Sequence, residues 1–395
     1  MAGSERLIAI AMASTDIDIE AAVATGSDTP FAIETLKLKA PAANEIRVKI
    51  VATSVCHTDL MSKDKALCEF PIVLGHEGVG VVDAVGDDVD DVDIGDHVIL
   101  SYDYCGHCPQ CESHKPSYCD QHGSLNFAGV RPDGGRTHRN PESDDYNIFG
   151  SFFQQSSFAS YALSHASNTI KVDKSLPLPL LAPLGCGVQT GAGTVLNTLQ
   201  VEADSSLVVF GCGCVGLSAI MAAKLAGAGN IIAVDINPAR LEVARELGAT
   251  HCVSPEDFSG GSEVVEHIKS QSRDGHGCHY AIDTTGIPAV LRQAFDCCGP
   301  LGVTAMIAPG VPGTEVSIEM LGLLPGKSLR GVVQGDSESK AFIPQLIEYW
   351  QQGKFPFDKL ITRFDGIENI GAAADAMRRG DIIKPVVIID RDFQE

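Results

Sequence analysis

Four cysteines in one short stretch constrain this chain more than any other feature of its sequence. They follow the spacing C-x2-C-x2-C-x7-C, in a loop that also contains glycine and proline, and they are Cys105, Cys108, Cys111 and Cys119. Tight turns bring such near neighbours together at little entropic cost, and four thiolates suit a tetrahedral zinc ion. We therefore predict a structural zinc site in this loop.

Two other interpretations of these cysteines remain open. They could form disulfides or pack as reduced thiols, and intervals of two residues also occur in iron–sulfur proteins. The iron–sulfur interpretation is the weaker one, because Cys119 lacks the usual partner spacing and no second cluster motif follows it.

Length and charge limit the remaining possibilities. A chain of 395 residues is too long for one ordinary core, which favours two domains. No uninterrupted apolar run is long enough to span a bilayer. The net charge is −22, from 29 basic and 51 acidic residues, and no basic cluster interrupts it. We therefore expect neither nucleic acid nor a membrane as a partner.

The 13 cysteines favour a reducing compartment, and we expect a cytoplasmic protein. Residues 7–14 form a short apolar run that ends in small residues, as a signal peptide does. The run is only about eight residues long and follows Glu5, so an opening strand is the preferred interpretation.

The first third of the chain is predicted to be β-rich, as a partly open barrel. Apolar and polar residues alternate in segments that are typical of half-buried strands, at residues 31–39, 46–50, 75–85 and 97–100. Residues 131–145 are polar and aperiodic, which predicts a surface loop. Aromatic β-type segments are expected at 149–153 and 158–163.

From residue 207 onward, apolar strands alternate with helices, which indicates an α/β doubly wound parallel sheet. Strands are predicted at residues 207–210, 231–234, 280–283, 302–307 and 329–333, and a last one at 385–389. Helices are predicted at residues 217–226, 238–247, 263–272, 289–297, 339–352 and 367–379.

A dinucleotide motif opens this second region. Gly211, Gly213 and Gly216 follow an apolar strand and begin a helix, and Asp235 ends the next strand. The glycines let the backbone approach a pyrophosphate at the helix N-terminus, and the aspartate accepts hydrogen bonds from the ribose hydroxyls. An aspartate repels a 2′-phosphate, so NAD(H) is favoured over NADP(H).

A second set of potential metal ligands is scattered along the chain. It consists of Cys56, His76 and Cys186, each unremarkable alone. Together with the cysteine loop and the dinucleotide motif, two thiolates and an imidazole suggest an open zinc site with one position for water or substrate.

With these motifs, the chain resembles the zinc-containing medium-chain alcohol dehydrogenases over its whole length. Residues 151–158, 186–193 and 331–336 are most similar to the aryl (benzyl) and allylic alcohol dehydrogenases. The resemblance implies a GroES-like catalytic domain with the structural zinc lobe at residues 1–187, a Rossmann NAD-binding domain at 188–333, and a return to the catalytic domain at 334–395.

The resemblance also implies roles for single residues. Cys56, His76 and Cys186 would hold a catalytic zinc, with Glu77 as an occasional ligand, and the cysteine loop would hold a structural zinc. Asp59 would orient His76, and Thr58 would take the proton of the alcohol. The implied cofactor-binding residues, besides the glycines and Asp235, are His57, Thr190, Val215, Arg240 and Lys384.

One position departs from the family pattern. Many members have a histidine five residues after the first zinc cysteine, where it ends a proton relay, and this chain has Met61 there. Water or His57 could replace it, or the pH optimum could be unusually high.

The predicted activity is NAD-dependent hydride transfer between a primary aromatic or allylic alcohol and its aldehyde, by a homodimer. The expected pocket residues are Ser101, Tyr102, Ile148, Phe149 and the segment near Leu324; alternatively, Tyr102 and Phe149 are barrel core. Two other functions stay open: a reductase for a dedicated biosynthetic intermediate, and a zinc- and nucleotide-binding protein without turnover.

Overall fold

The computed structural model describes residues 15–394, and the opening strand expected at 7–14 lies outside them. The chain divides into two compact units. The first unit comprises residues up to 186 together with 338–344 and the segment from 360 onward, and the second comprises 187–337 and 345–359. The long helix α11 (Ser339–Gln351) contributes residues to both units.

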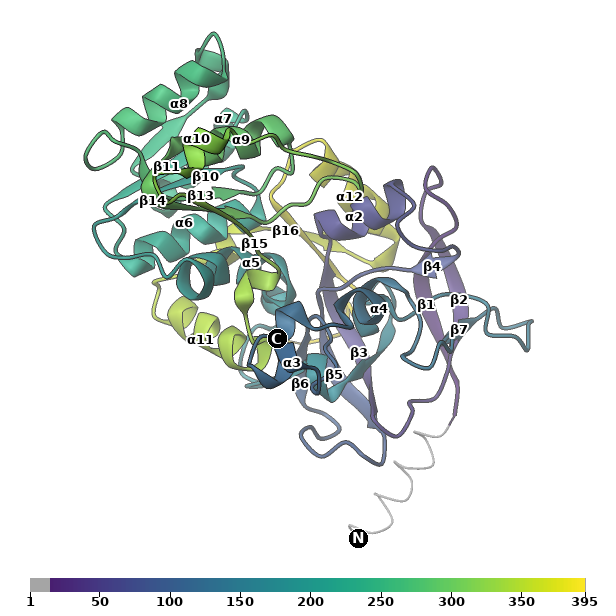
Figure 1. The fold of residues 1–395 in the computed structure, drawn as a ribbon. Coiled ribbons are helices and arrows are strands. Elements are labelled where there is room, and N and C mark those ends of the chain that lie inside the picture. Colours follow the sequence, from purple (N-terminus) through teal and green to yellow (C-terminus); the bar gives the residue numbers. More distant parts are fainter. Residues whose placement is uncertain (1–14, 395) are drawn as a thin grey trace. The chain divides into compact units, whose positions relative to one another are not determined.

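The first unit contains two sheets (Figure 1). A small antiparallel sheet has the order β4-β1-β2-β7, from Ile72–Val73, Ile17–Ala24, Ala32–Leu38 and His138–Arg139. The larger sheet has the order β16-β17-β3-β5-β6-β9, and β8 also pairs with β3. Its strands are Ile361–Asp365, Lys384–Ile388, Glu45–Ser54, Gly78–Val85, His97–Leu100, Thr169–Val172 and, for β8, Tyr161–His165. The helices of this unit are α2 (His57–Asp64), α3 (Pro109–Glu112), α4 (His122–Phe127) and α12 (Ile370–Arg378).

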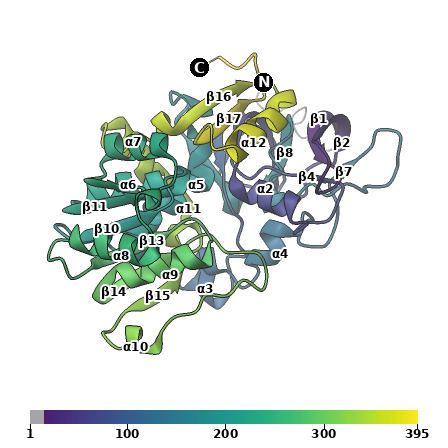
Figure 2. The same ribbon diagram turned by 90° about the horizontal axis from the view of Figure 1, so that it is seen from above.

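The second unit is built on a parallel six-stranded sheet with the order β12-β11-β10-β13-β14-β15. The strands are β10 (Ser206–Phe210), β11 (Asn230–Val234), β12 (His251–Val253), β13 (Cys278–Asp283), β14 (Cys298–Met306) and β15 (Ser328–Gly331). The helices are α5 (Gly187–Gly193), α6 (Cys214–Ala226), α7 (Pro238–Leu247), α8 (Gly261–Ser270), α9 (Pro288–Cys297) and α10 (Met320–Leu323). Helices α6 and α7 contact each other, as do α8 and α9, and the sheet lies between the two pairs (Figure 2). The predicted doubly wound sheet is confirmed.

Residues 149–153 differ from their predicted strand. The chain there forms a 3-10 segment over Phe152–Gln154 that is kinked at Phe153, where the left-handed backbone with φ 53° is incompatible with a strand. The second aromatic segment does form a strand, but β8 begins only at Tyr161. The expected loop at 131–145 contains the two-residue strand β7, and its Arg131 is buried in an ion pair with Glu45.

Across residues 15–394, no helix combines the length and the apolar character that crossing a membrane requires.

Candidate metal and nucleotide sites

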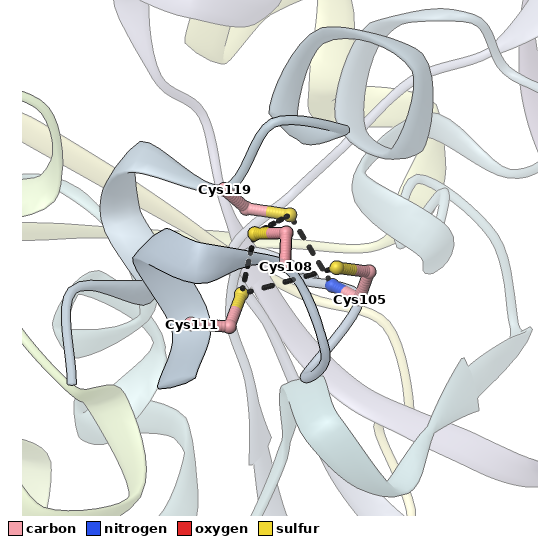
Figure 3. Close-up of side chains that lie close together, drawn as sticks. All are labelled: Cys105, Cys108, Cys111 and Cys119. Atoms are coloured by element: carbon pink, nitrogen blue, oxygen red, sulfur yellow. Dashed lines mark hydrogen bonds between the residues drawn. The ribbon is translucent and has the colours of Figure 1, made fainter. Parts of the chain in front are cut away.

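The four cysteines of the loop bring their sulfur atoms together (Figure 3). The sulfur of Cys108 lies 3.5 Å from that of Cys111 and 4.0 Å from that of Cys119, and all four lie within 4.8 Å of one another. A tetrahedral zinc ion with bonds of about 2.3 Å requires sulfurs about 3.8 Å apart. All 13 cysteines are free, which rules out the disulfide interpretation.

Backbone N–H groups donate hydrogen bonds to the cysteine sulfurs of this loop, which stabilises the anionic form of a sulfur. Asp120 donates to the sulfur of Cys108, and Cys105 and Gln121 donate to that of Cys119, at 3.4–3.5 Å. Hydrogen bonds from the backbone of Asp120 and Cys111 lower the pKa of Cys108 to about 6. Thiolate is the form that a metal ion binds, so Cys108 is suited to ligate a zinc ion, and the spacing of the four sulfurs fits such an ion.

A second group of ligand atoms lies within the first unit. One donor atom each from Cys56, His76, Glu77 and Cys186 lies within 4.8 Å of the others. Cys56 caps the N-terminus of α2, two residues after the end of β3, while His76 and Glu77 lie between β4 and β5. Cys186 ends the 3-10 helix over Leu178–Gly185. Segments far apart in the sequence therefore bring the four residues together.

Asp59 ties three parts of this group together. One carboxylate oxygen accepts the backbone N–H of Cys56 at 2.9 Å. The other accepts the backbone N–H of Gly75 at 3.0 Å and lies 2.8 Å from Nδ1 of His76. Asp59 is fully buried. This carboxylate places the proton of a neutral His76 on Nδ1 and leaves Nε2 as the metal-binding atom.

The donor set fits a metal ion. His76 Nε2 is buried and has no hydrogen-bond partner among residues 15–394. A buried polar atom without a partner is costly, and it lies here among two thiols and a carboxylate. The Cys186 thiol donates a hydrogen bond that lowers the pKa of Cys56 well below its ordinary value. Two sulfurs and one imidazole nitrogen match the protein ligands of an open zinc site.

Lys384 lies beside this group rather than at the surface. Its ammonium forms an ion pair with Glu77 and donates to the carbonyl oxygen of Val55 at 3.3 Å, and its side chain is 2% exposed. The hydroxyl of Ser54 also donates to Glu77. Burial raises the pKa of Glu77, and the charge of Lys384 opposes that rise. Its charge is paired with a buried carboxylate, and the phosphate contact that the resemblance implies for Lys384 stays a prediction.

The other two residues of the first motif are accessible. Thr58 lies in the first turn of α2 and is partly exposed, and His57 is exposed. Met61 follows on the same helix and is partly exposed.

The second unit carries the dinucleotide motif as a strand–turn–helix. Gly211 has φ +91°, and a Cβ on Gly216 would lie 1.8 Å from the carbonyl oxygen of Gly211, so the turn requires glycine at both positions. The Asp235 carboxylate accepts the backbone N–H of Cys212 at 2.6 Å and that of Asn237 at 2.8 Å. It is thereby fixed between the glycine turn and the end of β11.

The remaining nucleotide-site residues also lie in the second unit. Thr190 is in α5, and its hydroxyl donates to the side chain of Gln334 at 3.2 Å. Val215 lies in the first turn of α6. Nε of Arg240 is buried without a hydrogen-bond partner among residues 15–394.

Tyr102 and Phe149, which were predicted for the substrate pocket, fit the alternative interpretation as barrel core. Tyr102 is 1% exposed, and its hydroxyl lies 3.2 Å from that of Ser117, so it belongs to the core. Phe149 and Ile148 are also buried in that core, and Leu324 is 77% exposed on the second unit. A half-apolar strand predicts equally well a pocket wall and a barrel core.

Three buried residues beside His76 were missed as site residues. The ring of Phe153 stacks on the imidazole with centroids 4.5 Å apart, and Phe152 meets it edge-on. Gln155 donates to the carbonyl oxygen of His76 at 3.0 Å. Their only sequence signal was the resemblance of residues 151–158 to aryl alcohol dehydrogenases.

Comparison with known proteins agrees with this geometry. The alcohol dehydrogenase GroES-like domain matches residues 42–174, and the zinc-binding dehydrogenase model matches residues 214–348. Geraniol dehydrogenase from Castellaniella defragrans is 40% identical over 374 residues, covering 94% of this chain and 98% of that protein. The chain therefore belongs to the zinc-containing alcohol dehydrogenase family, whose members are NAD-dependent oxidoreductases.

Two solved structures are similar over nearly the whole chain. An alcohol dehydrogenase zinc-binding domain protein from Burkholderia ambifaria is 44% identical, with a TM-score of 0.90. Benzyl alcohol dehydrogenase from Acinetobacter calcoaceticus is 43% identical, with a TM-score of 0.89. Each match covers 95% of this chain and 100% of the other. The predicted family, fold class and cofactors are confirmed.

Proposed function

We propose that this protein interconverts a primary aromatic or allylic alcohol and its aldehyde, with NAD(H) as hydride carrier. The observation that carries the proposal is the group of Cys56, His76 and Cys186, in which the buried Nε2 of His76 lacks a hydrogen-bond partner among residues 15–394. The substrate class is supported by relatives that are named for geraniol and for benzyl alcohol.

The proposed roles follow from position. Cys56, His76 and Cys186 hold the catalytic zinc, with Glu77 close by as a fourth donor, and the four loop cysteines hold the structural zinc. When bound, zinc supplies a Lewis acid that lowers the pKa of an alcohol and polarises a carbonyl. Thr58 accepts the hydroxyl proton of the substrate, because it is accessible and lies two residues from Cys56. His57 is the accessible group that can carry the proton onward or contact a phosphate.

We assign catalysis to the first unit and nucleotide binding to the second. The turn from Gly211 to Gly216, which includes Gly213, cradles the pyrophosphate, and Asp235 accepts from the ribose hydroxyls. Arg240 flanks the adenosine ribose, with its buried Nε as the available donor. Thr190 and Val215 contact the nicotinamide.

We also infer a homodimer, because the second unit exposes a cluster of apolar residues. Leu301 is 77% exposed, Met320 84% and Leu324 77%. The backbone N–H of Leu301 bonds to the carbonyl of Pro325, so Leu301 lies beside the segment that carries Leu324, and Met320 on α10 lies four residues before Leu324. Exposed apolar surface of this kind is typical of an interface. Sedimentation should show a dimer for the native chain and a monomer after Met320→Lys with Leu324→Lys. A dimer that persists in the variant would refute the role of this surface as the dimer interface.

We also propose a cytoplasmic location, because the 13 cysteines are free.

Metal content and NAD+ reduction, measured together, test the proposed function. We expect two zinc ions per chain, and a higher kcat/KM for benzyl alcohol, cinnamyl alcohol and geraniol than for ethanol. Thr58→Val should lower kcat by about 10²–10⁴, the range of general acid–base catalysis, while Thr58→Ser retains most activity. Two zinc ions without turnover of these alcohols would contradict the substrate class and favour a dedicated substrate. One zinc ion would contradict one of the two sites.

A further inference from the structure

Residues 151–158 form a buried segment that runs beside the metal-ligand segment 73–78. The backbone N–H of Phe158 donates to Leu74, and that of Ser157 donates to Gly75, each at 3.0 Å. The two chains approach so closely that a Cβ on Gly75 would lie 2.5 Å from the backbone nitrogen of Phe158. All eight residues from 151 to 158 are buried. Segment 151–158 therefore packs directly against the segment that carries His76.

The side chain of Gln155 forms hydrogen bonds with the backbone on both sides of Glu77. Its side-chain oxygen accepts the N–H of Gly78 at 3.1 Å, and its side-chain nitrogen donates to the carbonyl of His76 at 3.0 Å. The same nitrogen donates to the carbonyl of Ser101 at 2.9 Å. Gln155 is fully buried. One carboxamide thus fixes the position of the main chain that carries His76.

Phe153 fixes the plane of the imidazole. Its ring stacks on His76 with centroids 4.5 Å apart and planes inclined by 27°. The backbone is left-handed at Phe153, Gln154 and Ser156, with φ of 47–53°. Such values are unfavourable for bulky residues and persist only where the surroundings over-determine them. In this strained conformation, the side chains of Phe153 and Gln155 both contact His76.

We propose that Gln155 and Phe153 are positioning residues for the metal ligand His76. Asp59 sets the tautomer of His76 through Nδ1, Gln155 holds its main chain, and Phe153 restricts rotation of its ring. Together they leave Nε2 one direction in which to bind a metal ion. This inference rests on the proposed role of His76 as a ligand of the catalytic metal.

The chain contains a matched control for Gln155. Gln154 is the same residue type, is also buried, and donates to two carbonyl groups, those of Leu125 and Val130, at 2.8 and 2.9 Å. It makes no hydrogen bond to segment 73–78 among those found in residues 15–394. Gln155→Met and Gln154→Met each remove a buried carboxamide of similar shape, but only the first removes a contact with His76. Phe127→Leu is the corresponding control for Phe153→Leu. Phe127 packs on Phe153, whereas Phe153 itself stacks on His76.

The experiment measures metal release from the full-length enzyme, loaded with zinc or with cobalt at the catalytic site. A chelator is added, and the loss of each metal ion is followed together with the cobalt d–d and thiolate charge-transfer bands. We expect Gln155→Met and Phe153→Leu to accelerate release from the catalytic site by about 10- to 100-fold, as when support of a metal ligand is lost. Their cobalt bands should also shift. Release from the four-cysteine loop should stay within twofold.

Gln154→Met and Phe127→Leu should lower the thermal midpoint by a similar amount and leave metal release within about twofold of the native rate. If Gln155→Met and Gln154→Met release metal at the same rate, Gln155 has a general structural role and the proposal is overturned. If Gln155→Met does not fold, Phe153→Leu decides the question by the same comparison. A native enzyme that binds no zinc at the group of Cys56, His76 and Cys186 would refute the proposed function itself, which separates that failure from failure of the positioning role.

Discussion

Replacing Lys384 by methionine tests whether this residue stabilises the metal-site region or binds the cofactor. The ammonium is 2% exposed and pairs with a fully buried Glu77. Methionine preserves the aliphatic stem and removes the charge, so Glu77 is left buried with Ser54 as a neutral partner. Breaking a buried ion pair in this way costs about 3–5 kcal/mol, because the remaining charge is uncompensated. We expect that loss in the first unit.

Each unit offers its own signal for this measurement. Trp350 is the single tryptophan and belongs to the second unit, so its fluorescence in urea is an internal reference. Hydrogen exchange of the amides in β17 and β3, which pair with each other, reports on the first unit. A loss of 3–5 kcal/mol corresponds to a decrease in protection of about 10²- to 10⁴-fold. The Kd for NADH should remain within about threefold.

The double variant Glu77→Gln with Lys384→Met isolates the charge. Removing both partners should recover about 2 kcal/mol relative to Lys384→Met alone, because no buried charge then remains. The opposite pattern would refute the reasoning: unchanged protection in β17, with NADH binding at least tenfold weaker. In that case Lys384 would bind phosphate, as the family resemblance implies.

Three further predictions concern other parts of the chain. Burial, with a contribution from Arg131, lowers the pKa of His138 from 6.5 to about 3. The unfolded chain therefore binds a proton that the folded chain rejects below pH 6.5, and stability falls by about 2 kcal/mol between neutral pH and pH 5. His138→Gln should remove that loss in urea titrations, and the exposed His276→Gln should retain it; equal slopes would contradict the assignment. Asp235→Ala should raise the ratio of kcat/KM for NADP+ to that for NAD+ at least tenfold, because a carboxylate that repels the 2′-phosphate is lost; an unchanged ratio would show that another group discriminates. Cys119→Ser should lower the metal content from two zinc ions to one and lower the thermal midpoint, as measured by mass spectrometry and calorimetry; a content of two would exclude Cys119 as a ligand.

The sequence predicted those elements whose signals are local. Helix α7 begins and ends at the predicted residues, because proline stands at its first position and Gly248 follows its last. The cysteine loop was found because its ligands lie within 15 residues and their spacing has few other uses. Helix α2 was missed, because its N-cap is Cys56, a residue that rarely caps a helix, and its reciprocal partner Asp59 resembles any acidic residue.

Contacts between distant segments could not be predicted in this way. Lys384 begins a strand, where a lysine normally indicates an exposed end, and its partner Glu77 lies more than 300 residues earlier. The left-handed backbone at Phe153 is invisible to any pattern of apolar residues, because phenylalanine there is compatible with a strand. The resemblance supplied the metal ligands and Asp59, but not Gln155 and Phe153, which contact His76 from segment 151–158.

Support for the ligand residues comes from side chains that are not ligands themselves. Asp59 accepts the N–H groups of Cys56 and Gly75 and contacts His76, so one carboxylate links α2 to the ligand segment. Asp59→Asn would keep the shape, but an amide cannot accept hydrogen bonds on both sides, so at least one backbone donor or the imidazole loses its partner. The geometry at Nε2 depends on this carboxylate for its tautomer and on Gln155 for its main chain. Two residues of different chemistry thus constrain one imidazole from opposite ends, which is how a site of few ligands can be held rigid.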